Sequence, residues 1–146
     1  MNNQNDATEI ARLCRAWLES VSAREDVKNF NFMERVSHFY APGDNLILFD
    51  NADPKAQIAS SASEYGQIWD SLWTKLVYYD IQIIREPIVF VDGDLAVSIL
   101  VWEETILTNR EEAEQHVSFL CTLAWQRTQQ SWRIVHEHAT TLSAER

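Results

Sequence analysis

The sequence predicts an α+β domain in which three helices in the first half of the chain cover one face of a curved antiparallel sheet. Three observations support this fold class. Apolar residues recur with helical spacing three times before position 77, the pattern then changes to that of strands, and an Asp-Gly pair at positions 92 and 93 separates two strand-like runs. Helices followed by long strands are typical of α+β domains.

The first two helices are predicted from their apolar spacing and their end signals. The first spans residues 8–21, and its one-sided apolar stripe consists of Ile10, Leu13, Cys14, Trp17, Leu18 and Val21. The second runs from Asp26, a suitable N-cap, to about Tyr40, because Pro42 and Gly43 follow. We expect residues 1–6, ahead of the first helix, to be disordered.

A short strand and a third helix are predicted next. LILF (46–49) has the composition of a strand, and the polar segment 50–60 is expected to be a loop. Ser61 and Glu64 stand at the spacing of a capping box. The apolar residues that then repeat with helical spacing are Tyr65, Ile68, Trp69, Leu72, Trp73 and Leu76.

Four long strands are predicted after these helices. They cover residues 77–91, 95–107 and 116–127 and a last segment from Trp132. The Asp-Gly pair favours the positive φ of a hairpin turn between the first two. Polar residues do not alternate cleanly along VSILVW or VSFLCTLAW, so both faces of the sheet need cover.

Length, charge and cysteine content limit the class of protein. A chain of 146 residues fits one domain, 1–146, and a net charge of −10 argues against binding to nucleic acid or to an anionic membrane, which both need basic patches. The two cysteines, Cys14 and Cys121, are far apart and are expected to be buried thiols. MNNQND lacks the blocks of a signal peptide, and no apolar run is long enough to span a membrane, so we expect a cytoplasmic protein.

Three segments resemble those of SnoaL-like and nuclear transport factor 2-like proteins, which are relatives of ketosteroid isomerase. They are WRIVHEHAT (132–140), similar to the closing strand of that group, VDGDLAV (91–97) and FYAPGDNLILFD (39–50). The match covers nearly the whole chain in order, but AQIASSASEY (56–65) lacks the glycine that many relatives carry before the third helix. The resemblance implies a cone-shaped fold with an internal cavity, and a homodimer that packs through the sheet.

Asp50 is the candidate catalytic base. It follows the LILF strand, about where the ketosteroid isomerase pattern places its base. The oxyanion hole of that pattern is absent, because its tyrosine and acid positions fall near Trp17 and Cys121, and neither residue can donate as that chemistry requires. This departure argues against steroid isomerisation. As an alternative, Asp50 starts an Asx turn in the following loop.

His136 and His138 are candidate acids or bases, because an imidazole titrates near neutral pH. In a regular strand they share a face with Trp132 and Ile134, roughly 7 Å apart, and Glu137 points to the other face. A metal would need a third ligand from elsewhere, for instance His116 or Glu103, so a metal-dependent site is kept only as a third, less favoured alternative and no metal ligand is assigned. The alternative is a buried histidine bonded to a carbonyl or a carboxylate.

An aromatic cavity for a flat or cyclic ligand is the second candidate feature. The residues that could line it are Trp17, Tyr40, Trp69, Trp73, Trp102 and Cys121, together with one inward glutamate. Adjacent strand residues face opposite ways. Of Glu103 and Glu104 we expect Glu103 to point inward with Val97, Ile99 and Val101, although Trp102 on the other face favours the opposite choice. At helical spacing, Trp69 and Trp73 are also consistent with ordinary core.

Two functions are compatible with these residues. One is cofactor-free proton transfer, an isomerisation or dehydration of a small carbonyl or cyclic compound, with Asp50 as base and a histidine as its acid partner. The other is a non-catalytic module of the same fold that binds a small ligand or mediates assembly. The expected partners are therefore a small molecule and a second copy of the chain.

Overall fold

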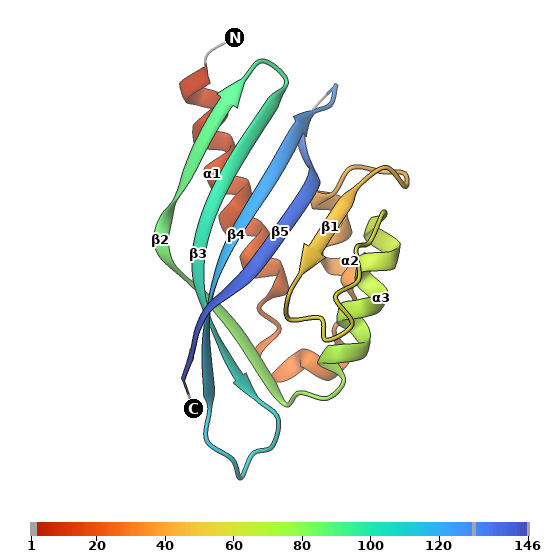
Figure 1. Ribbon diagram of the computed structural model, residues 1–146, viewed down its shortest axis with the longest axis vertical. Helices are drawn as coiled ribbons and strands as arrows, with labels where there is room; N and C mark the ends of the chain where they lie inside the picture. Colours follow the sequence, from red (N-terminus) through yellow and green to blue (C-terminus); the bar gives the residue numbers. More distant parts are fainter. Residues whose placement is uncertain (1–2, 130, 146) are drawn as a thin grey trace.

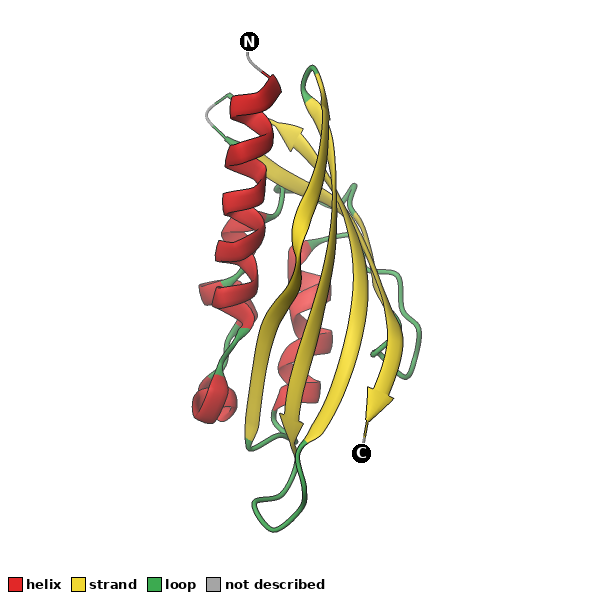
Figure 2. Ribbon diagram, turned by 90° about the vertical axis from the view of Figure 1, so that its left-hand side faces the viewer, coloured by secondary structure: helices red, strands yellow, loops and turns green. Residues whose placement is uncertain are grey.

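A five-stranded mixed sheet is the main element of the fold. The computed structural model describes residues 3–129 and 131–145, and the strand order is β1-β5-β4-β3-β2. The strands are β1 (Ile47–Asp50), β2 (Tyr78–Asp92), β3 (Leu95–Leu107), β4 (Gln115–Arg127) and β5 (Trp132–Glu145). Neighbouring strands are antiparallel except β1, which is parallel to β5. The sheet is curved and the helices lie on its concave side (Figure 2), which confirms the predicted fold class.

Helix α1 (Asn3–Val21) packs along the concave face of the sheet, behind the long strands in Figure 1. The predicted apolar stripe is the buried face of this helix. Cys14 Sγ lies 3.4 Å from Ser98 Oγ on β3, which shows which face of the sheet the helix covers. The helix begins at Asn3, whereas the sequence predicts disorder for residues 1–6; Met1 and Asn2 lie outside the described residues.

The second predicted helix is wrong as a continuous element. Three short segments replace it: η1 (Arg24–Asn29), α2 (Phe32–Arg35) and η2 (Ser37–Phe39). Phe30 and Phe32 are both buried, and two positions apart they would point to nearly opposite sides of an uninterrupted helix. The chain instead becomes extended at Phe30, and the side chain of Asn31 starts a new helix by accepting a hydrogen bond from the Glu34 N–H.

Helix α3 (Ala62–Trp73) begins as the sequence predicts. The Ser61 side chain accepts a hydrogen bond from the Glu64 N–H, and the Glu64 carboxylate accepts one from the N–H of Ser60. No helix in the described part of the chain combines the length and apolar character that a membrane span requires.

The hairpin between β2 and β3 is confirmed. Asp92 pairs with Leu95, and Gly93 adopts φ +61°, which glycine reaches at little cost. Alternation along β3 then turns Ser98, Leu100 and Trp102 toward the helices.

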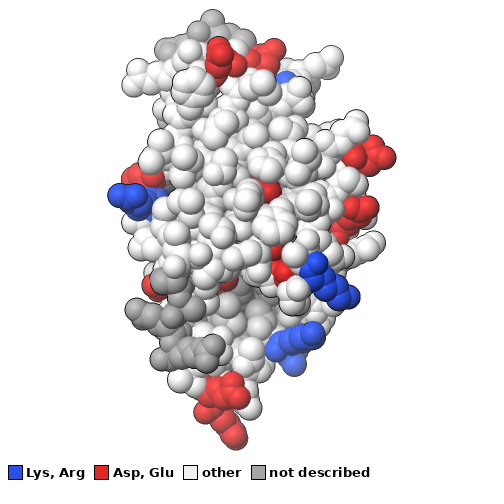
Figure 3. All heavy atoms as spheres, in the orientation of Figure 1, with Lys and Arg blue, Asp and Glu red and all other residues white. Residues whose placement is uncertain are grey.

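No helix formed by the described residues covers the opposite, convex face of the sheet. Its exposed apolar residues on β2 and β3 include Ile88, Phe90, Leu95, Val97 and Ile99. In Figure 3 the central part of this face carries few charged side chains. The structure therefore leaves one of the two apolar faces that the sequence predicts without cover.

Candidate functional site

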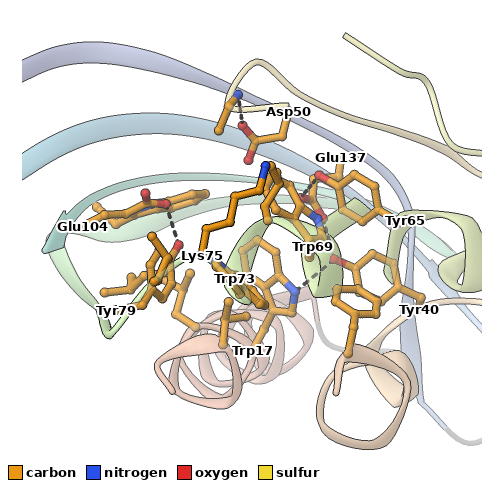
Figure 4. A pocket seen from close by; sticks show the side chains of 18 of the residues that line it. Trp17, Tyr40, Asp50, Tyr65, Trp69, Trp73, Lys75, Tyr79, Glu104 and Glu137 are labelled. Carbon is orange, nitrogen blue, oxygen red and sulfur yellow. Dashed lines mark hydrogen bonds between the residues drawn. The ribbon is translucent and has the colours of Figure 1, made fainter. Parts of the chain in front are cut away.

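A cavity of about 300 Å³ lies between the helices and the concave face of the sheet (Figure 4). All five aromatic residues expected from the sequence contribute to its wall: Trp17, Tyr40, Trp69, Trp73 and Trp102. Three acidic side chains also line it, and each is at least nine-tenths buried: Asp50, Glu104 and Glu137. The site is thus an aromatic chamber that contains three carboxyl groups.

Glu137 lies at one end of the cavity and is held by two tyrosines. The hydroxyl of Tyr40 lies 2.6 Å from Oε1, and that of Tyr65 lies 2.6 Å from Oε2. Trp17 Nε1 donates to the Tyr40 hydroxyl at 3.1 Å, so this network of hydrogen bonds extends to α1. Burial raises the pKa of Glu137 to about 8, although the two tyrosine hydrogen bonds lower it. Glu137 is therefore largely protonated at pH 7.

Glu104 occupies the other end of the cavity, as Figure 4 shows. The Tyr79 hydroxyl and Trp102 Nε1 both donate to its Oε1, at 2.7 and 3.1 Å. Burial raises the pKa of Glu104 to about 8, against these two hydrogen bonds. The expectation that Glu103 points inward is wrong: Glu103 lies on the convex face, with Oε1 3.5 Å from His116 Nδ1.

Asp50 ends β1 and points into the cavity from the edge of the sheet. Its Oδ1 accepts a hydrogen bond from the Ala52 N–H at 2.8 Å, so the Asx turn suggested by the sequence is present. Asp50 also lines the cavity and is 7% exposed, so the turn and a role in the site are compatible. Burial raises the pKa of Asp50 to about 6, which leaves it mainly ionised at pH 7.

The two candidate histidines lie outside the cavity. A hydrogen bond of 2.8 Å joins His136 Nδ1 to the carbonyl oxygen of Ile47, and the exposed His138 ring packs edge-on against Phe49. The expected pairing of Asp50 with a histidine in the pocket is therefore not formed.

A β-bulge explains why the histidines point away from the cavity. Trp125 of β4 pairs with Ile134 of β5, but the preceding Ala124 pairs with His136, so β5 contains one extra residue here. An extra residue reverses the alternation of side chains beyond it. Ile134 and Glu137 consequently face the same side of the sheet, although three positions separate them.

Cys121 is fully buried but does not line the cavity, so it is a core residue beside the site. Burial raises its pKa well above the ordinary value of a thiol. Within residues 3–129 and 131–145, no three His, Cys, Asp or Glu side chains are grouped as metal ligands would be.

Comparison with solved structures identifies the architecture. No family model and no curated protein matches the sequence. A nuclear transport factor 2-like superfamily protein from Salmonella enterica superposes with a TM-score of 0.79 at 16% identity, over 97% of this chain and 94% of the other. The chain has the nuclear transport factor 2-like fold. The sequence resemblance is thereby confirmed at the level of the fold.

Two further structures with this fold differ in their names. A candidate scytalone dehydratase from Novosphingobium aromaticivorans has a TM-score of 0.76 at 10% identity, over 98% of this chain and 88% of that one. A candidate calcium/calmodulin dependent protein kinase II association domain from Xanthomonas campestris has a TM-score of 0.68 at 19% identity, over 92% and 86%. Of these two proteins with the same fold, one is thus named as an enzyme and the other as an association domain.

Sequence reasoning did not assign six polar residues that line this nuclear transport factor 2-like cavity: Tyr65, Lys75, Tyr79, Glu104, Thr108 and Glu137. Tyr65 and Tyr79 look like ordinary apolar members of a helix and a strand, and only the structure brings each hydroxyl to a carboxyl. Glu137 lies in the same HEH triplet as the two histidines, and the sequence predicted that its side chain points to the opposite face of the strand. That predicted orientation was a signal that could have identified Glu137 as an alternative site residue.

Proposed function

We propose that the cavity catalyses cofactor-free proton transfer on a small cyclic or carbonyl compound, an isomerisation or a dehydration, with Asp50 as the base. The observation that carries this proposal is that two buried carboxyl groups with different hydrogen-bond partners, Asp50 and Glu137, line one aromatic cavity. Groups whose environments push their pKa values apart can act as base and acid at the same pH. Asp50 is the ionised member and Glu137 the protonated one.

The acid in this reaction is the hydrogen-bonded group of Tyr40, Tyr65 and Glu137. When Glu137 is protonated, its O–H donates to the Tyr65 oxygen, and the Tyr65 O–H is then available to a carbonyl oxygen in the cavity. Asp50 removes a proton from the carbon beside that carbonyl, and Tyr65 transfers its own proton to the oxygen and is replenished by Glu137. Burial raises the pKa of Tyr65 well above its ordinary value, which keeps this hydroxyl protonated before the reaction.

This arrangement supplies what the ketosteroid isomerase pattern lacked here. A tyrosine paired with a protonated carboxylic acid is one known form of oxyanion hole. In this chain the pair comes from α3 and β5 rather than from the positions near Trp17 and Cys121. The name of the candidate scytalone dehydratase with the same fold is consistent with an elimination.

The test is deuterium exchange at the carbons beside the carbonyl of cyclohexanone, 2-cyclohexenone and 2-tetralone, followed by NMR in D₂O. We expect protein-dependent exchange of at least one ketone, with a rate that rises through about pH 6 as Asp50 ionises and falls above about pH 8 as Glu137 loses its proton. Exchange no faster than in buffer for all three ketones would contradict the proposal.

The uncovered convex face supports assembly as a second candidate function. Ile88 and Phe90 are 61% and 68% exposed, and Val97 and Ile99 lie beside them on β3. Contiguous exposed apolar surface commonly marks a protein interface. We propose that a second copy of the chain covers this face, with the two sheets packed against each other.

Replacing Phe90 by glutamate is expected to convert such a dimer to a monomer at micromolar concentration, because the interface would bury a charge without a partner. Sedimentation velocity measures the change. Ile58→Glu is the matched control, since Ile58 is 69% exposed in the loop before α3. A parent protein that is already monomeric, or a Phe90→Glu protein that is still dimeric, would refute this interface.

A further inference from the structure

The Glu104 end of the cavity contains a carboxyl group that the proposed proton transfer does not use. Glu104 is 6% exposed, and the two hydrogen bonds it receives both end on Oε1. Its other oxygen, Oε2, accepts no hydrogen bond from the described residues, and the residue lines the cavity. Oε2 is therefore available to a group on a bound molecule.

No basic side chain of the described residues forms an ion pair with Glu104. The ion pairs of arginine and histidine in that part of the chain involve other acids. Lys75 lines the same cavity from beyond the end of α3, but its side chain is exposed. Its ammonium nitrogen has no carboxylate oxygen of the described residues within 4.0 Å. A buried carboxyl group in apolar surroundings is costly to ionise unless a cation accompanies it.

Aromatic residues line the cavity beside this carboxyl group. Trp102 and Tyr79 contact it directly, the Tyr79 ring centroid lies 5.1 Å from that of Trp73, and the Trp102 centroid lies 5.9 Å from that of Trp17. The faces of such rings attract cations, and ammonium groups in proteins are commonly held by several aromatic rings. A carboxylate beside such rings has the chemistry of an ammonium site.

We infer that the Glu104 end of the cavity binds an ammonium group, so that the substrate is a small cyclic or carbonyl compound carrying a protonated amine. This inference rests on the proposed function in that it names the substrate class of the same site. The ammonium group lies against Oε2 of Glu104 and the rings of Trp73, Tyr79 and Trp102. The reacting carbonyl then lies toward Asp50 and Tyr65, at the other end.

Binding of the cation is linked to loss of a proton from Glu104. Its pKa of about 8 in the empty cavity falls when a positive charge lies beside it, so at pH 7 a proton is released and affinity rises between about pH 6 and 8. The other titratable groups that face the cavity come from other elements of the fold and are Tyr40, Asp50, Tyr65, Lys75, Tyr79 and Glu137. Of these, Asp50 contributes to the raised pKa of Glu104.

The test compares benzylammonium with benzyl alcohol, which is similar in size and also donates hydrogen bonds but carries no charge. Quenching of the cavity tryptophans gives the dissociation constants at pH 8, and calorimetry in buffers of different ionisation enthalpy measures proton release at pH 7. We expect benzylammonium to bind about tenfold more tightly than the alcohol. Equal affinities, or no binding of benzylammonium at millimolar concentration, would overturn the inference.

Variants at two adjacent residues, Glu104 and Glu103, test where the ammonium group binds. In Glu104→Gln the amide oxygen can still accept from Tyr79 and Trp102, so the fold is retained, and we expect the preference for benzylammonium and the proton release to disappear. Glu103→Gln removes the same charge from the convex face of the same strand and is expected to keep both. A preference that survives in Glu104→Gln, or that is lost only in Glu137→Gln, would show that the ammonium group is not at Glu104.

These results separate the inference from the proposed function. Exchange of the neutral ketones without any preference for benzylammonium leaves proton transfer intact and rejects the ammonium site. A preference for benzylammonium that depends on Glu104, without exchange of any ketone, supports the ammonium site in a protein that binds but does not catalyse.

Discussion

Replacing Asp50 by asparagine is expected to lower the rate of ketone exchange by about 10²–10⁴-fold, the usual contribution of a positioned general base. The amide oxygen of asparagine can still accept the hydrogen bond from Ala52, so the Asx turn and the shape of the loop are retained. What the variant loses is the carboxylate that accepts the proton. Because the ligand contacts are otherwise unchanged, binding measured by tryptophan quenching is expected to change far less than the rate.

Asp44→Asn is the matched control for this experiment. Asp44 is exposed on the turn before β1, so the variant changes the net charge equally without touching the cavity. The rate of this control is expected to equal that of the parent, and thermal unfolding of both variants checks that each is folded. If the Asp50→Asn protein exchanged ketones as fast as the parent, Asp50 would not be the base.

The second large effect is on stability, and its direction is unusual. The free energy of unfolding is expected to fall as the pH rises from about 5 to about 8, by about 3 kcal/mol or more. Glu104 and Glu137 have folded pKa values of about 8, and Asp50 one of about 6, all above their ordinary values. In this window the folded protein holds protons that the unfolded chain has released, so a rise in pH favours unfolding.

Other acids do not reverse this trend. Hydrogen bonds from Arg127, Arg12 and backbone amides hold the pKa values of Asp6, Glu9 and Asp53 below their ordinary values. Their stabilising effect is complete once the unfolded chain has ionised, which happens near pH 4, so it hardly changes between pH 5 and 8. The buried carboxyl groups therefore dominate the slope.

Urea unfolding at pH 5, 6.5 and 8 measures this slope, and variants assign it. In Glu104→Gln and in Glu137→Gln the free energy of unfolding is expected to depend less on pH, because each lacks one group that must ionise. Glu103→Gln, on the convex face, should keep the slope of the parent. Stability that is constant or rises from pH 5 to 8 would show that the cavity carboxyl groups ionise freely.

Most of the fold follows from local features of the sequence. The apolar stripe of residues 10–21, the capping residues Ser61 and Glu64 and the glycine of the hairpin each act through neighbours within a few positions, and all three appear where predicted. The aromatic residues that line the cavity and the position of Asp50 at the end of β1 were also predicted. These features depend on local spacing, or on a resemblance that extends along the chain.

Which acids face the cavity depends on contacts between segments that are distant in the sequence. Glu103 and Glu104 have opposite faces in any strand, and only the packing of α1 against Ser98 determines that the face of Glu104 is the inner one. In β5, the bulge that pairs Ala124 with His136 turns Glu137 inward and the histidines outward. Alternation along a strand predicts only which side chains share a face. Which of the two faces is covered by helices, and where a bulge inserts an extra residue, depends on contacts with segments that are distant in the sequence.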